Sequence, residues 1–140
     1  ENVFQDMNEG HFIEGGALNT FGEKYDYEGK DFKPTMKYNL LGTTMNYFIE
    51  NSILDIPDYI KIDVDGIEHL ILEGGDKFLN NEKVKSLSIE VNENFKEQYD
   101  NILKLMNKYE FQLFHKKHND DIFSKQSNFK NVYNYIFKKL

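Results

Sequence analysis

Residues 57–68 read Pro-Asp-Tyr-Ile-Lys-Ile-Asp-Val-Asp-Gly-Ile-Glu, a stretch that predicts a strand followed directly by a helix. Apolar and polar side chains alternate between Tyr59 and Val64, which is the period of a strand with one buried face. A helix is expected at once after this strand, because its apolar positions recur at a 3.6-residue period. The predicted apolar face of the strand carries Ile60, Ile62 and Val64, and the polar face carries Lys61 and Asp63.

Further elements are predicted on both sides of this stretch. Upstream, Thr43 or Thr44 can cap a helix that ends before Pro57. Downstream, Gly74-Gly75 is expected to break or kink the helix that follows the strand. The remaining predicted elements are a strand over Ser86–Asn92, a helix over Phe95–Tyr109, and strands over Phe111–His115 and Val132–Phe137.

Strands that alternate with helices indicate an α/β fold with right-handed crossovers and a mainly parallel sheet. The last two strands have no helix between them, so an antiparallel pair is expected at the C-terminal edge. Residues 42–140 would form this α/β part, and residues 1–41 would be irregular with short strands and a mobile loop around Tyr25 to Pro34. The whole chain of 140 residues is expected to be a single domain.

Composition narrows the function classes. The net charge is −7 without a basic stripe, which argues against a nucleic-acid partner. The absence of Cys excludes disulfides, thiolate catalysis and Cys-based zinc sites. No apolar run approaches the roughly 20 residues that cross a bilayer, and no signal-peptide pattern opens the chain, so a cytoplasmic location is expected. A loose basic group suggests a solvated loop or, alternatively, a phosphate or sugar-nucleotide contact: Lys116, Lys117, Lys125 and Lys130.

Carboxylates gather where ligands bind in open α/β sheets, at the carboxyl ends of the strands. Asp63 and Glu90 occupy the polar faces of successive predicted strands, and Lys61 could pair with Asp63. A carboxylate inside a strand is costly to bury without a partner or a task, which favours a functional role for Asp63. Asp65 and Glu68 instead have the spacing of a capping box, in which Glu68 would reach back to the Asp65 amide.

These motifs resemble the FkbM family of S-adenosylmethionine-dependent methyltransferases. Lys61-Ile-Asp-Val-Asp-Gly-Ile-Glu68 is similar to the family signature Lys-Ile-Asp-Val-Glu-Gly-Ala-Glu, with Asp65 in place of Glu. Further similar segments are Leu72–Gly75, Ser88–Asn92, Gly16–Phe21 and Leu41–Phe48, in the last of which Asn46 replaces an Asp. The resemblance covers most of the chain.

The resemblance implies a Rossmann-like methyltransferase fold and methyl transfer from S-adenosylmethionine to a hydroxyl of a sugar or other small molecule. Asp63 would act as general base, or would bind a divalent metal together with Asp65. Glu90 would be the second catalytic carboxylate. Weaker candidates for contacts with the acceptor are Asn92, His11 and Asn19.

The Gly-rich turn that holds the cofactor in such enzymes is not found. Glu14-Gly-Gly-Ala17 has little strand before it and no amphipathic helix after it, so no cofactor-binding residue is assigned. The chain is therefore expected to be the C-terminal portion of the fold, without the N-terminal cofactor-binding strands. Such a portion could be a non-catalytic fragment that acts through association, either with a second copy or with a missing N-terminal half.

A phosphatase of the haloacid-dehalogenase type is the alternative enzyme. Ile62-Asp-Val-Asp-Gly66 resembles its Asp-x-Asp-Gly loop, in which Asp63 would attack phosphate and Asp65 would act as the acid, aided by magnesium. Ile67 stands where that family has a Thr, and the Asp120-Asp121 pair is predicted in a loop rather than at a strand end.

Overall fold

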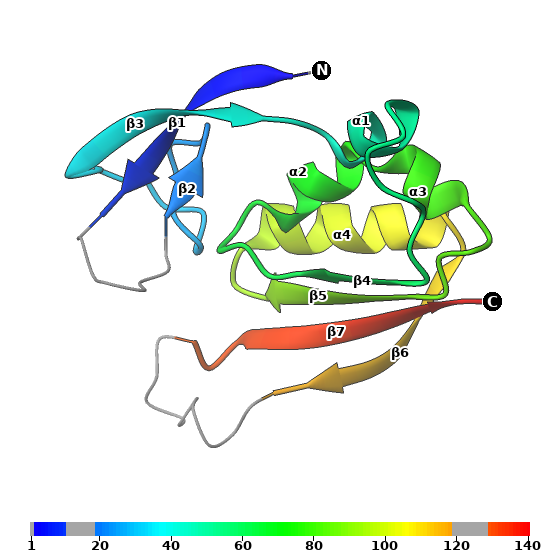
Figure 1. Ribbon diagram of the computed structural model, residues 1–140. Helices are drawn as coiled ribbons and strands as arrows, with labels where there is room; N and C mark the ends of the chain where they lie inside the picture. The colour runs from blue at the N-terminus through cyan, green and yellow to red at the C-terminus, as the bar shows by residue number, and fades with distance from the viewer. Residues whose placement is uncertain (1, 11–18, 119–128) are drawn as a thin grey trace.

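The computed structural model describes residues 2–10, 19–118 and 129–140, which form two sheets and a layer of helices (Figure 1). The small sheet has the order β2-β1-β3, and the larger sheet has the order β4-β5-β7-β6. The strands are β1 Val3–Glu9, β2 Thr20–Phe21, β3 Met36–Gly42, β4 Tyr59–Ile62, β5 Ser86–Asn92, β6 Phe111–Lys117 and β7 Val132–Lys139. The helices are α1 Met45–Glu50, α2 Glu68–Glu73, α3 Asp76–Asn80 and α4 Lys96–Lys108.

The prediction of a mainly parallel sheet is wrong for the pairing of the strands. Among the described strands only β4 and β5 pair in parallel, whereas β7 is antiparallel to both β5 and β6. The expected antiparallel pair of β6 and β7 is confirmed. Because β7 lies between β5 and β6, two antiparallel pairs replace the one parallel pair that β5 and β6 could have formed, although β4, β5 and β6 all run in the same direction.

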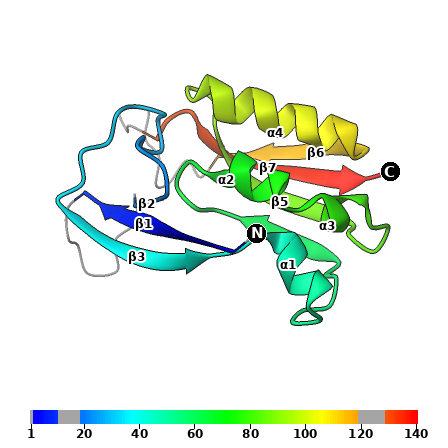
Figure 2. The same cartoon turned by 90° about the horizontal axis from the view of Figure 1, so that it is seen from above.

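The helices α2, α3 and α4 lie on one face of the larger sheet (Figures 1 and 2). Apolar side chains of the strands point toward this layer, and Leu87, Ile89 and Val91 of β5 have no exposed surface. Ile102 and Met106 of α4 complete the core from the helix side, as the predicted stripe required. None of the described helices combines the length and apolar character that a bilayer crossing requires.

The N-terminal region is more regular than predicted. β1 and β3 each have seven residues and pair in continuous register from Val3 opposite Gly42 to Glu9 opposite Met36. Apolar and polar residues do not alternate regularly there, because both strands are largely exposed and neither has a buried face that would require it. Between β2 and β3 the chain makes a turn closed by a bridge between Tyr25 and Asp31.

Helix ends follow the local signals in most places. The hydroxyl of Thr44 accepts a hydrogen bond from the amide of Tyr47 at 3.2 Å, which confirms it as the cap of α1. Gly74-Gly75 separates α2 from α3, as expected. β4 ends at Ile62, so Asp63 and Val64 lie just beyond the strand instead of within it.

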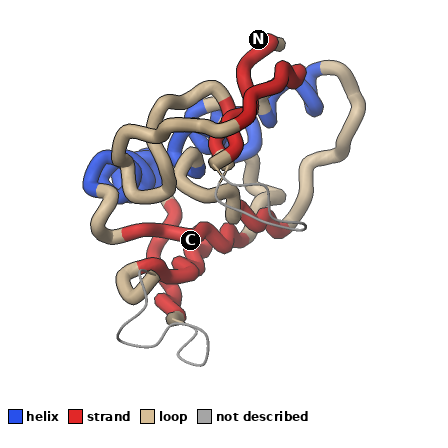
Figure 3. The backbone as a smooth tube through the Cα atoms, turned by 90° about the vertical axis from the view of Figure 1, so that its left-hand side faces the viewer, coloured by secondary structure: helices blue, strands red, loops and turns tan. Residues whose placement is uncertain are grey.

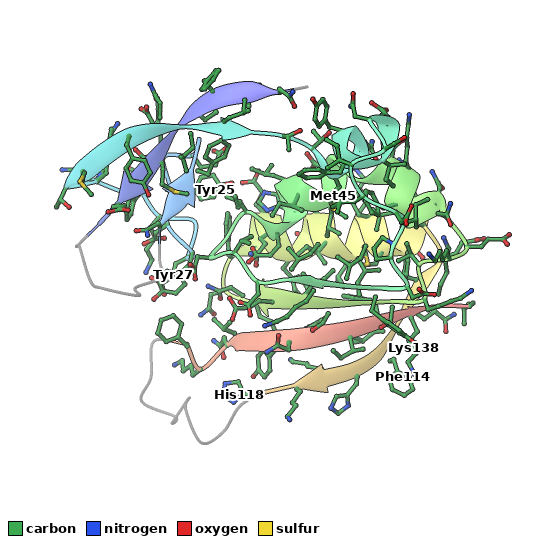
Figure 4. The ribbon with its side chains drawn as sticks, viewed as in Figure 1. Tyr25, Tyr27, Met45, Phe114, His118 and Lys138 are labelled. Atoms are coloured by element: carbon green, nitrogen blue, oxygen red, sulfur yellow. The ribbon has the colours of Figure 1, made fainter. Side chains whose placement is uncertain are left out.

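The turn between β2 and β3 sits over the carboxyl ends of β4 and β5. Figure 3 views the molecule from this side, and Figure 4 shows Tyr25 and Tyr27 between the small sheet and these strand ends. The side-chain amide of Asn92 donates to the carbonyl of Tyr27 at 2.9 Å. Gly66 packs directly beneath Tyr27, because a Cβ at Gly66 would lie 2.9 Å from the Tyr27 Cα. The turn after β4 and the turn after β2 are therefore in backbone contact.

Gly66→Ala should destabilise the protein by about 2 kcal/mol or more, because it combines a clash with Tyr27 and a φ of +115° that L side chains rarely adopt. Urea unfolding measures the change. Gly10→Ala is the control, since its Cβ would meet only the Phe32 ring at 3.4 Å. Equal stability of the two variants would contradict the assigned contact.

Candidate functional site

Asp63 lies at the carboxyl end of β4 with an exposed side chain. Its carboxylate forms an ion pair with the Lys61 ammonium at 2.7 Å, as the shared strand face predicted. The hydrogen bond and the charge of Asp63 raise the pKa of Lys61. Asp63 is therefore exposed to solvent, and it lies one residue beyond the end of β4 instead of inside the strand as predicted.

Glu90 lies beside Asp63 on the neighbouring strand β5. The parallel register pairs Lys61 with Ser88 and Ile62 with Ile89, so the next position on each strand brings Asp63 alongside Glu90. Glu90 is half-buried, and burial raises its pKa to about 7, with the charges of Asp63, Glu68 and Asp65 adding to the shift. The two predicted catalytic carboxylates are thus brought together, and Glu90 is the one poised to exchange a proton at neutral pH.

Glu68 does not form the predicted capping box. The N-cap of α2 is Ile67, and no side chain caps this helix. The Glu68 carboxylate is completely buried and accepts from the amides of Val64 at 3.0 Å and Gly66 at 3.1 Å. It therefore holds the turn that carries Asp65, which has a left-handed φ of 60°. Burial raises the pKa of Glu68, and its hydrogen bonds offset part of that effect.

Gln98 is a site residue that the sequence reasoning missed. The side-chain NH2 group of Gln98 donates to the Glu68 carboxylate at 2.5 Å, and the side-chain oxygen of Gln98 accepts from the backbone N–H of Asn92 at 2.9 Å. The available signal was its position four residues before Ile102, which puts a polar side chain on the buried face of α4. Through Gln98, α4 connects the end of β4 with the end of β5.

The weaker candidates have other surroundings. Asn92 is buried and binds the Tyr27 carbonyl and the Asn94 amide, so it anchors turns. Asn19 immediately precedes β2 in the small sheet, and His11 lies outside the described residues. In the described part of the chain no group of three or more His, Asp or Glu side chains is arranged to hold a metal ion, so metal binding by Asp63 and Asp65 stays a prediction.

Lys116 is the member of the basic group with a defined environment. Its ammonium pairs with Glu93 and lies 3.7 Å from the centre of the Tyr133 ring. Burial alone would raise the pKa of Glu93, but hydrogen bonds from Lys116 and Tyr135 lower it overall. Lys125 is outside the described residues. Lys116 is thus engaged within the protein and does not present a bare phosphate-binding charge.

A separate apolar cavity of about 420 Å³ lies between the small sheet, α1 and α2. Phe21, Phe48 and Leu70 contribute to its lining, and Gln5 and Glu23 supply polar atoms. Asp63 and Glu90 are not part of this lining. The cavity is therefore distinct from the carboxylate pair.

The expected cofactor, S-adenosylmethionine, needs a turn whose glycine leaves room for a ligand. In the described ranges, a glycine lies where a strand leads into a helix at Gly42, the last residue of β3 before α1, and at Gly66, between β4 and α2. A Cβ at Gly42 would lie 2.5 Å from the Phe21 ring, and Tyr27 fills the space at Gly66. These two turns therefore do not fit a binding site for the cofactor.

The Glu90 carboxyl is expected to titrate near pH 7, which carbon-13 NMR of labelled glutamate side chains can measure. Asp63→Asn should lower this pKa, because it removes a neighbouring negative charge that disfavours ionisation. Asp58→Asn, at the other end of β4, should leave the pKa of Glu90 unchanged because solvent and salt screen a charge at that distance. A Glu90 midpoint near 4.5 would contradict the assignment.

The raised pKa of Glu90 also makes the stability of the protein depend on pH in a defined direction. The folded state holds the Glu90 proton more tightly than the unfolded state, so Glu90 contributes stability below the unfolded pKa and loses it as pH rises through about 7. Glu90→Gln should therefore be more stable than the wild type above pH 7, and the difference should vanish in acid. Urea unfolding of the wild type and of Glu90→Gln, above pH 7 and in acid, tests the direction of this difference.

A known protein family matches most of this chain. The Methyltransferase FkbM domain matches residues 13–113, which is well over half of the chain and includes both Asp63 and Glu90. Comparisons with curated proteins and with solved structures gave no significant match. The family match favours the methyltransferase interpretation over the phosphatase alternative for the Asp63 and Asp65 motif. The chain belongs to the FkbM family of S-adenosylmethionine-dependent methyltransferases.

Proposed function

We propose that the carboxyl ends of β4 and β5 form the acceptor side of an O-methyltransferase site. The observation that carries this proposal is Glu90, a half-buried carboxyl with a pKa of about 7 that lies beside Asp63 at the ends of β4 and β5. A general base is most effective when its pKa lies near the working pH. Family membership supplies the reaction class, and this pair supplies a group that can take the proton of an acceptor hydroxyl.

Each carboxylate has its own role in the proposal. Glu90 removes the hydroxyl proton, since it is the group that changes protonation near neutral pH. Asp63 keeps the Glu90 pKa high by its charge and accepts a hydrogen bond from a neighbouring hydroxyl of the acceptor. The Lys61 ammonium at 2.7 Å fixes the direction of the Asp63 carboxylate. Asp63 therefore orients the acceptor and Glu90 activates it.

The proposed acceptor is a sugar or another small polyhydroxylated molecule. Carboxylates and an ammonium group on one exposed strand end offer hydrogen-bond partners for several hydroxyls at once. The strand ends are also bordered by Tyr27, whose ring stacks on Phe129 with 5.1 Å between ring centres. An aromatic border beside polar groups suits a ligand with alternating apolar and hydroxylated surfaces.

Methyl transfer from labelled S-adenosylmethionine to a panel of hydroxylated sugars tests the proposal. Glu90→Gln should reduce kcat by about 10²-fold or more, because it removes the proton acceptor. The wild-type rate should fall about tenfold for each pH unit below 7, as Glu90 becomes protonated. Glu82→Gln, an exposed carboxylate before β5, is the control and should keep full activity. Full activity in Glu90→Gln would refute the assigned role.

We also infer a second candidate, in which the chain works only in association with further polypeptide. Within the described residues β4 pairs with β5 alone, and the glycine turns do not fit the cofactor. An unpaired strand edge is a template for another strand. A second copy or an additional segment could supply both the strand and the cofactor-binding residues.

Light scattering and calorimetric titration with S-adenosylhomocysteine test this association. The expected result is that binding of S-adenosylhomocysteine appears only at concentrations at which the protein is oligomeric. A monomer that binds S-adenosylhomocysteine in the micromolar range would contradict this second candidate. That outcome would leave the assigned roles of Asp63 and Glu90 intact.

A further inference from the structure

We infer that Glu68 and Gln98 form a positioning pair that fixes the turn carrying Asp63 and Asp65 relative to Glu90. This inference rests on the proposed roles of Asp63 and Glu90. Neither member of the pair is placed to touch the acceptor, since both are buried below the strand ends. They act through the backbone that they hold.

The first argument is the cost of the Glu68 site. An ionised carboxylate without exposed surface is strongly unfavourable unless hydrogen-bond donors surround it. Glu68 has three donors, namely the amides of Val64 and Gly66 and the side chain of Gln98. Hydrogen bonds to a charged acceptor are about twice as strong as neutral ones. The turn that follows β4 is thus held by a buried carboxylate through two backbone amides.

The second argument is that consecutive hydrogen bonds connect Glu68 to the end of β5. Glu68 accepts from Gln98, and Gln98 in turn accepts from the Asn92 amide at the end of β5. Asn92 lies two residues after Glu90 on the same strand and also binds the Tyr27 carbonyl. One continuous path therefore connects the turn after β4, the end of β5 and the turn after β2. Val64 follows Asp63 directly and Asn92 lies two residues after Glu90, so the path fixes the backbone next to both carboxylates.

The third argument is that the two side chains have fixed roles, with Gln98 as the hydrogen-bond donor and Glu68 as the acceptor. Glu68→Gln replaces one acceptor oxygen by an NH2 group, which would face either the NH2 group of Gln98 or the N–H of Val64. Turning the Gln98 side chain over cannot relieve this, because its amide group would then face the Asn92 N–H. Gln98→Glu would instead place two carboxylates in contact. The double variant Glu68→Gln/Gln98→Glu restores the hydrogen bond between the two side chains and those from the backbone N–H groups of Val64 and Asn92, with the charge moved to position 98. The Gly66 N–H then keeps only the longer contact to Oε1, at 3.4 Å.

Hydrogen exchange of three amides, those of Val64, Gly66 and Asn92, tests the pair. Each single variant should reduce the protection of these amides by about tenfold or more, whereas the Ile89 amide within β5 should keep its protection relative to them. The double variant should recover the protection of the Val64 and Asn92 amides to within about threefold of the wild type, whereas the Gly66 amide should stay less protected because it shares the Oε2 acceptor with Gln98. Glu73→Gln, an exposed carboxylate on the same helix, is the matched control and should change none of them.

Steady-state kinetics with the acceptor provide a second measurement, which distinguishes a positioning role from a purely structural one. On sugars accepted by the wild type, the single variants should raise KM for the acceptor and lower kcat, and the double variant should recover both. Unchanged protection in the single variants, or a folded double variant as unprotected as they are, overturns the inference. Absence of turnover in the wild type would count against the proposed function alone, because the exchange result does not depend on turnover.

Discussion

The arrangement of the site depends on a buried carboxylate that has to find hydrogen-bond donors. Glu68 has no exposed surface, and it meets this requirement with the amides of the turn after β4 and with Gln98. The requirement joins three elements that are distant in sequence, because the donors come from the turn and from α4, and Gln98 also binds the end of β5. A solvated Glu at this position would place no such demand on its neighbours.

Electrostatic crowding at the strand ends gives the site its chemical character. Burial disfavours the ionised form of Glu90, and the charges of Asp63, Glu68 and Asp65 disfavour it further. The folded protein is therefore less stable with Glu90 ionised than it would be with a neutral residue there. Tolerated destabilisation of this kind is typical of groups that perform proton transfer, because a base with an ordinary carboxyl pKa would be too weak at neutral pH.

The sheet keeps this site on one edge. β4, β5 and β6 run in the same direction, so the connecting helices α2, α3 and α4 cover one face (Figure 1). The carboxyl ends of these strands then meet at the edge over which the turn at Tyr27 lies. Phe114 of β6 is exposed, and its ring contacts the Lys138 ammonium of β7 (Figure 4). The chemistry and the core thus occupy different parts of the same sheet.

The sequence by itself determined the local elements around the signature: the faces of β4 and β5, the cap at Thr44, the break at Gly74-Gly75 and the pairing of Lys61 with Asp63. These follow from periodicity and from neighbours within a few residues, which a sequence displays directly. The tertiary structure alone decided the insertion of β7, the pairing of β1 with β3, and the hydrogen bonds of Glu68 with Gln98. Each of these joins segments whose separation in sequence carries no periodic signal, so only packing and the need to satisfy buried polar groups could select them.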